Sequence, residues 1–277
     1  MDTLHPRDVG EKNKVLLVFP SGMALYAYWM GVAESITRHL KLDGDDGLLS
    51  KVTFASSSAG GFPVAALLLR ASGGLSPVEI MQLGNTRFTI CMLLEPWRLF
   101  EVTKWHMKSL LEKKNIAKHL HAIRITNNTE PVYVRVEDTD AYVSAIVASA
   151  NFATYSKLNG VGDRCWDGAF SCDWEQRSLG GWLLLDIVGY GWLPKWVVYA
   201  YKYLFWLSND HLFMLGYKQG LATIVRKLHK ELQIPLTTAN VLKEMPTSNE
   251  VAAHPKNPCG LWKAPLLYTI FFALALM

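Results

Sequence analysis

The chain has 277 residues, and 28 Lys and Arg against 24 Asp and Glu give a net charge of +4 at pH 7. Half of the residues are hydrophobic, ten are Trp, and 19% are charged, against roughly 25% in soluble domains. This composition excludes intrinsic disorder, which needs low hydrophobicity and high net charge, and four Cys exclude a disulfide-stapled mini-protein. The lack of long uncharged apolar runs argues against a polytopic channel.

The first residues, 1–14, are polar and charged and contain no apolar stretch of the kind found in secretory signals. We therefore expect an intracellular, reducing setting in which the four cysteines stay thiols. The cysteines and histidines do not have metal-ligand spacing, so no metal and no cofactor are expected. A net charge of +4 is too small to indicate nucleic-acid binding.

Strand and helix patterns alternate in the first part of the chain. Residues 15–19 form a short continuous apolar run, which is typical of a buried strand. Residues 23–40 repeat apolar side chains at helical spacing and predict an amphipathic helix. A loop at 43–47 precedes a second strand at 52–55, after which residues 64–69 resume a helix. This alternation indicates an α/β fold.

Further elements are predicted towards the middle of the chain. A helix is predicted to start at Ser76, because Ser is a favoured N-cap residue and Pro77 suits the first helical position. Glu79 can complete a capping box by accepting a hydrogen bond from the backbone N–H of Ser76. Residues 98–121 are helical and basic, which we interpret as a solvated face. Residues 131–136 alternate like a strand.

The aromatic-rich segment 180–207 carries many Trp and Tyr and few charges. These side chains either pack in the core or, over 182–206, form a lid or docking surface, because Trp and Tyr favour membrane–water interfaces. Residues 212–232 predict an amphipathic helix, and 235–260 predict a loop region punctuated by Pro and Asn.

The C-terminal tail, 261–277, ends in fourteen uncharged residues, fewer than the roughly 20 that span a bilayer. The tail either packs on the core or inserts partly in a membrane, with Trp262 and Lys263 at the headgroup level. No repeat or linker divides the chain between the polar N-terminal segment and this tail. We therefore expect a single α/β domain at 15–260.

The main chemical clue is a serine-rich turn between a strand and a helix. A nucleophile elbow puts a Ser on a sharp turn there, and it needs small residues two positions before and two after. Ser56 and Gly60 meet this requirement for Ser58, although a glycine is usual at position 56. A helix beginning at Ala59 would point its N-terminal amides at a developing oxyanion. The alternative is a turn that only caps an ordinary helix.

A serine nucleophile needs a base, and a carboxylate serves this role without histidine in some sites. The candidate is Asp167, because Gly168 after it allows a tight turn and a close backbone approach. An Asp-Gly pair is also an ordinary turn signal. His211, His229 and His254 lie downstream, but no sequence context marks any of them as a base.

Taken together, these motifs resemble the patatin-like phospholipases. Members of that family have a Gly-bearing oxyanion loop, then G-x-S-x-G, then D-G-G or D-G-A. The chain has Gly22 after its first strand, Ser58 in the elbow and D-G-A from Asp167, in the same order. The stretch 143–152 is similar to the family's small-residue segment ahead of the aspartate, so the resemblance covers about residues 15–170.

The resemblance implies a three-layer α/β/α patatin-like fold with a central, mostly parallel sheet. It implies that Ser58 is the nucleophile and Asp167 its base, a dyad that hydrolyses lipid acyl esters through an acyl-enzyme. Main-chain N–H groups of the first loop, at Gly22 and Met23, would hold the oxyanion. The implied substrate is a phospholipid or glycerolipid, met by a peripherally associated protein at a membrane or lipid-droplet surface.

The first loop departs from the family pattern G-G-G-x-[RK]-G, because residues 21–26 are S-G-M-A-L-Y and keep only Gly22. A catalytically impaired relative that serves as a lipid-binding or structural subunit is therefore a second hypothesis. A conventional α/β-hydrolase with a His base is a third. The position of the elbow, after one strand–helix unit, argues against this third hypothesis.

Overall fold

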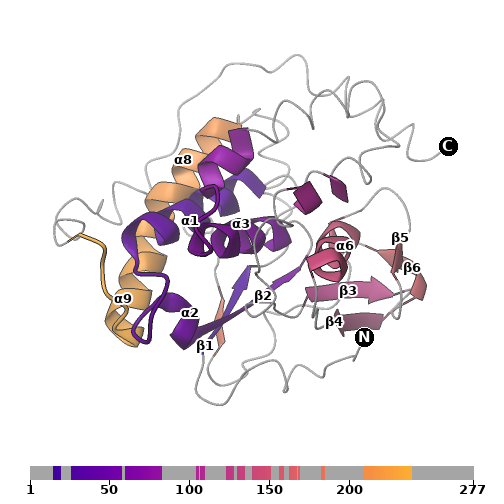
Figure 1. Cartoon of the computed structure of the whole chain (residues 1–277), viewed down its shortest axis with the longest axis horizontal. Helices are drawn as coiled ribbons and strands as arrows, with labels where there is room; N and C mark the ends of the chain where they lie inside the picture. The colour runs from indigo at the N-terminus through magenta and orange to yellow at the C-terminus, as the bar shows by residue number, and fades with distance from the viewer. Residues whose placement is uncertain are drawn as a thin grey trace, which may run out of the picture.

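The structure, a computed structural model, is shown in Figure 1. It describes residues 15–19, 26–57, 60–82, 104–105, 107–109, 123–127, 130–134, 139–150, 156–158, 162–166, 168, 182–184 and 209–238. The predicted segments at 1–14 and 261–277 lie outside them.

Within these residues, seven strands form one sheet in the order β5-β6-β3-β2-β1-β7, with β4 beside β3. They are β1 (Val15–Phe19), β2 (Val52–Ser57), β3 (Ile123–Asn127), β4 (Glu130–Val134), β5 (Ser156–Leu158), β6 (Gly162–Trp166) and β7 (Trp182–Leu184). The strands predicted at 15–19 and 52–55 are confirmed, and β2 continues two residues further. The strand predicted at 131–136 is confirmed as far as position 134, where the described residues end.

The sheet is mixed rather than mostly parallel. Pairing is parallel across β7, β1, β2 and β3, and antiparallel between β3 and β4, β3 and β6, and β5 and β6. Only residues 128–129 separate β3 from β4, and only 159–161 separate β5 from β6. Connections this short make antiparallel pairs, because a parallel pair needs a crossover of a dozen or more residues. The α/β class itself is confirmed.

Helix α1 (Tyr26–His39) lies at the centre of the described helices, and its residues 27–36 are all buried. It packs against α3 (Gly61–Ala71). Figure 1 shows both helices, together with α6 (Thr139–Ser149), on the same side of the strands. The helix predicted at 23–40 is confirmed from Tyr26 onward, and the one at 64–69 is confirmed within α3.

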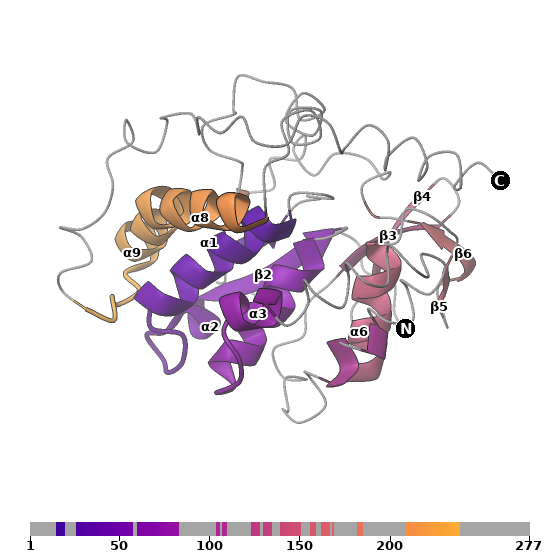
Figure 2. The same cartoon turned by 90° about the horizontal axis from the view of Figure 1, so that it is seen from above.

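A long helical run lies along α1 (Figure 2). It consists of α8 (Asn209–Gln219), the π-helical segment η7 (Gly220–Val225) and α9 (Arg226–Leu232), and it confirms the helix predicted at 212–232. A Cβ added to Gly31 of α1 would lie 2.7 Å from the backbone nitrogen of Tyr217. A Cβ added to Gly216 of α8 would overlap the carbonyl oxygen of Tyr28. Glycine at these two positions therefore allows α1 and α8 to approach.

The capping box predicted at Ser76 is confirmed. The backbone N–H of Ser76 donates to Oε2 of Glu79 at 2.7 Å, and the backbone N–H of Glu79 donates to Oγ of Ser76 at 3.4 Å. The hydrogen bonds from the Ser76 backbone and side chain hold the pKa of Glu79 below its usual value. The short helix α2 (Leu48–Lys51), which was not predicted, follows the loop at 43–47 and leads directly into β2.

Of the basic helix predicted at 98–121, residues 104–105 and 107–109 are described, and they are helical. Lys108 in this segment pairs with Asp140 of α6 at 3.1 Å. Within the described ranges, no helix is both long enough and apolar enough to cross a membrane.

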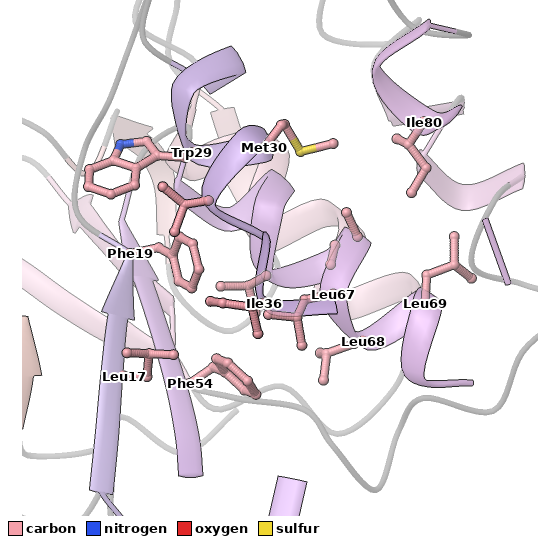
Figure 3. Close-up of a cluster of buried hydrophobic side chains, with 14 of the residues drawn as sticks. Leu17, Phe19, Trp29, Met30, Ile36, Phe54, Leu67, Leu68, Leu69 and Ile80 are labelled. Atoms are coloured by element: carbon pink, nitrogen blue, oxygen red, sulfur yellow. The ribbon is translucent and has the colours of Figure 1, made fainter. Parts of the chain in front are cut away.

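The hydrophobic core lies between the first two strands and the helices that follow them. Figure 3 shows Leu17 and Phe19 of β1 and Phe54 of β2 directed toward Ile36 of α1 and Leu67 of α3. All five side chains are fully buried. The core therefore fixes α1 and α3 on the sheet, and with them the elements that flank the predicted oxyanion loop and elbow.

Candidate functional site

The strand β2 and the helix α3 frame the predicted nucleophile. β2 ends at Ser57, and α3 begins at Gly61 after Gly60, its N-cap. A strand before Ser58 and a helix after it are therefore present as predicted, and α3 starts two residues after the predicted position. Ser58 and Ala59 themselves lie outside the described residues.

The start of α3 is held against α6. A Cβ on Gly61 would lie 2.9 Å from Cγ2 of Ile146, which is closer than real side-chain carbons approach. Gly61 therefore allows the first turn of α3, with the positive end of its dipole, to sit at a fixed place beside the end of β2. The sequence did not indicate this role, because it depends on a helix far along the chain.

Strand β3 pairs with both strands that precede the predicted catalytic residues, β2 before Ser58 and β6 before Asp167. β4 pairs with all five residues of β3 and so occupies one of its two edges. β2 and β6 therefore share the other edge, where Ser57 pairs with Arg124 and Trp166 pairs with Thr126. In Figure 1, β2 reaches β3 from the left, and β6 lies at the right-hand end of β3.

Only Ile125 of β3 separates these two pairings. Two residues along a strand correspond to about 7 Å, so the carboxyl ends of β2 and β6 come within about that distance of each other along the edge of β3. Ser58 is the next residue after β2, and Asp167 is the next after β6, and both lie outside the described residues. Gly168, directly after Asp167, is described and buried.

The predicted oxyanion loop connects β1 to α1 at this same end of the sheet. Phe19, the last residue of β1, pairs with Ser56 of β2, and α1 begins at Tyr26. Gly22 and Met23 belong to that connection and lie outside the described residues. Ser56, at the position where the motif usually has glycine, is buried within the sheet, so the strand accommodates a side chain there.

His229 lies at the opposite end of the sheet from Ser57. Its Nδ1 is 2.8 Å from the carbonyl oxygen of Ile234. The carbonyl oxygen of Leu232, close by in the chain, accepts a hydrogen bond of 2.8 Å from Nζ of Lys51, the residue directly before β2. The six residues of β2 extend for roughly 20 Å. His229 is therefore not placed to activate a serine that follows this strand.

His211 lies in the first turn of α8. Gly216, further along α8, contacts Tyr28 in the first turn of α1, so the start of α8 lies towards the start of α1. The side chain of His211 and all of His254 lie outside what the structure describes. Among the histidines that it does describe, His211 is the one nearest the carboxyl end of β1 by its backbone.

Two buried donors near these elements have no partner among the described residues. Nε1 of Trp29 on α1 and the hydroxyl of Tyr142 on α6 are buried and make no hydrogen bond with the described part of the chain. Burial raises the pKa of Tyr142 far above its usual value. In the same described part, no group of His, Cys, Asp and Glu is arranged to hold a metal ion, and Cys165 of β6 is buried.

The aromatic segment begins inside the sheet. Trp182–Leu184 is strand β7, which pairs in parallel with β1. These three residues therefore belong to the fold itself rather than to a separate lid or docking surface. The rest of that predicted surface, residues 185–206, lies outside the described residues.

No protein-family model matches the chain, and no curated protein does. Among solved structures, the chain is similar to a chain in the heterodimeric complex ExoU-SpcU from the type III secretion system of Pseudomonas aeruginosa, with 12% sequence identity and a TM-score of 0.38. The match covers 94% of this chain and 59% of that chain, so this chain spans less than two thirds of its length. A likeness at this level does not establish a shared family.

Proposed function

We propose that the protein is a serine-dependent lipid acyl hydrolase of the patatin-like kind, with Ser58 as nucleophile and Asp167 as its base. The observation that supports this proposal is the shared edge of β3, on which β2 and β6 end with only Ile125 between their pairings. Ser58 and Asp167 each follow one of these strand ends by a single peptide unit, about 3.8 Å between Cα atoms. Two residues that the motifs select independently thus follow strand ends that converge.

In the proposed reaction, Oγ of Ser58 attacks the carbonyl carbon of an acyl ester while its proton passes to the carboxylate of Asp167. Asp167 returns that proton to the departing alkoxide, which leaves as an alcohol, and the acyl group stays on Ser58. A water molecule then attacks the acyl-enzyme, gives its proton to Asp167, and releases the fatty acid as Ser58 regains the proton. Backbone N–H groups at Gly22 and Met23 stabilise the oxyanion, each contributing about 3–4 kcal/mol.

The proposed substrate is a phospholipid or glycerolipid at a membrane or lipid-droplet surface, and the proposed architecture is the three-layer α/β/α arrangement of the patatin-like enzymes. The composition of 185–206 and of the C-terminal tail supports a surface of this kind, because both are rich in apolar and aromatic residues. Trp and Tyr are favoured where an apolar interior meets water.

A fluorophosphonate probe with a long alkyl chain tests the proposal, because it phosphonylates activated serines. We expect the full-length protein to be labelled, Ser58→Ala to be unlabelled, and Asp167→Asn to be labelled at least 100-fold more slowly, within the range for loss of a general base. Ser57→Ala is the matched control and should keep its labelling, because it makes the same chemical change at the last residue of β2, one position before Ser58.

Labelling that persists in Ser58→Ala would contradict the assignment of the nucleophile. A wild-type protein that is folded by circular dichroism and yet unlabelled would refute hydrolysis. That result would favour the second hypothesis, a lipid-binding or structural subunit, which vesicle co-sedimentation of the same protein would then test.

A further inference from the structure

Trp29, in the first turn of α1, is a large side chain that is almost fully buried. It is 1% exposed, and its Nε1 has no acceptor in the described part of the protein. An indole N–H can only donate. Nearly all buried polar groups in native proteins are paired, and no described residue pairs with this one, which makes it a candidate donor to a bound molecule.

The indole lies at the carboxyl end of β1. Its ring is edge-on to that of Phe19, the last residue of β1, with ring centroids 6.0 Å apart. Figure 3 shows Trp29 beyond Phe19 as seen from Leu17, with its nitrogen on the side of the ring that faces away from the core. Phe19 pairs with Ser56, so the donor faces the end of the sheet at which β1 and β2 both finish. Ligands of open α/β sheets bind outside this end of the strands.

We propose that Nε1–H of Trp29 donates a hydrogen bond to the carbonyl oxygen of a lipid acyl ester bound at this end of the sheet, so that Trp29 binds and positions the substrate. This inference rests on the proposed function. It adds a side-chain donor to a site whose other proposed donors are backbone N–H groups of the loop that precedes α1.

The apolar, uncharged surroundings of the indole favour a neutral hydrogen-bond acceptor over an anionic one. Phe19 and Tyr28 contact the ring edge-on, and residues 27–33 of α1 carry no charge. A phosphate or carboxylate buried here would need a cation beside it. An ester carbonyl accepts the single N–H, and its acyl chain gains contact with the aromatic rings.

The indole N–H resonances of the full chain, labelled with nitrogen-15, test this contact directly. Ser58→Ala protein is titrated with monooleoylglycerol, a neutral acyl ester, below its aggregation concentration. The Trp29 resonance is identified by its proximity to Phe19 or by its absence from Trp29→Phe. We expect this proton to move downfield because hydrogen bonding deshields it, while Trp105, which is 59% exposed, stays unchanged. A Trp29 resonance that does not move at saturating monooleoylglycerol would overturn the inference.

The rate of fluorophosphonate labelling is a second readout that a purely structural role would not change. We expect Trp29→Phe to be labelled about tenfold more slowly, which corresponds to one neutral hydrogen bond in the transition state. Trp105→Phe makes the same chemical change at the protein surface and should keep the wild-type rate. Equal rates for Trp29→Phe and wild type, with labelling still dependent on Ser58, would overturn the role of Trp29 and leave the proposed function standing. A shifted Trp29 resonance in a protein that is never labelled would refute hydrolysis and support acyl binding at Trp29.

Discussion

Tyr28 donates a hydrogen bond of 2.6 Å to Oε1 of Gln219, and both residues are buried although 191 positions separate them in the chain. Tyr28 is next to Trp29 in the first turn of α1, and Gln219 is the last residue of α8. The bond therefore ties the helix that follows the predicted oxyanion loop to a helix from the last third of the chain. The placement of α1 therefore depends on a residue far along the chain from the predicted loop and elbow.

Replacing Tyr28 by Phe is expected to lower the free energy of unfolding by about 1–3 kcal/mol, because Gln219 keeps a buried acceptor without this donor. Urea unfolding of the two proteins measures the difference. In the double variant Tyr28→Phe/Gln219→Leu, the loss should be smaller than the sum of the two single losses, since both partners are then absent. Strictly additive losses would show that the two side chains are not coupled.

The close approach of α1 and α8 predicts a large effect for Gly216→Ala. In an open helix, this change stabilises by about 1 kcal/mol. Here a Cβ would overlap the carbonyl oxygen of Tyr28, so we expect a net loss of at least ~2 kcal/mol in thermal or urea unfolding, the range of overpacked cores. Met214→Ala, at an exposed position two residues away on α8, is the control and should change stability by less than ~1 kcal/mol. Similar losses in both variants would contradict the packing argument.

Local sequence patterns were sufficient for the elements whose causes are local. The apolar run of β1, the helical spacing of α1 and the capping box at Ser76 each involve residues a few positions apart, and each was predicted correctly. The elbow was predicted from an equally local pattern, because small residues two positions on either side of Ser58 are its requirement, and it stays a prediction.

The elements that bring the site together could not be predicted, because their causes lie far apart in the chain. β6 has the sequence G-D-R-C-W, without the alternation of a half-buried strand, and it forms by pairing with β3. The edge that β2 and β6 share depends on β4 covering the other edge of β3. The contact of Gly61 with Ile146 likewise requires α6. Motifs therefore selected Ser58 and Asp167 as candidates, whereas the sheet register was needed to show that the ends of β2 and β6 lie near each other.

Tyr142 is fully buried. We expect Tyr142→Phe to change the free energy of unfolding in the opposite direction from Tyr28→Phe. Its hydroxyl has no hydrogen-bond partner in the described part of the protein, so Tyr142→Phe removes an unpaired group and leaves none behind. We expect stability to stay equal or to rise by up to about 1 kcal/mol. Urea unfolding at pH 7 measures this. A loss as large as that of Tyr28→Phe would show that the hydroxyl of Tyr142 has a partner.

The raised pKa of Tyr142 also predicts a dependence of stability on alkaline pH, since burial opposes ionisation in the folded state only. Its stabilising contribution is fully present below the pKa of an unfolded Tyr, about 10, and is lost as the pH rises above it, because the unfolded state then releases a proton that the folded state keeps. Wild type should therefore lose stability faster than Tyr142→Phe above about pH 10, by up to 1.4 kcal/mol per pH unit. Parallel stability curves for the two proteins between pH 8 and pH 11 would contradict this assignment.

A Ser-Asp dyad and a triad differ in whether a histidine is needed for activity. His229 is bonded to Ile234 at the amino end of β2, which leaves His211, in the first turn of α8, as the described histidine to test. We expect His211→Ala to keep its rate of fluorophosphonate labelling and of fatty-acid release from phospholipid vesicles within about threefold of wild type, and Asp167→Asn to lose at least 100-fold. His229→Ala is the control for loss of an imidazole away from the site. If His211→Ala is as inactive as Ser58→Ala while Asp167→Asn stays active, the base is a histidine and the protein is a conventional hydrolase. If both variants lose activity, His211 and Asp167 act together with Ser58 in a triad, and the dyad is wrong.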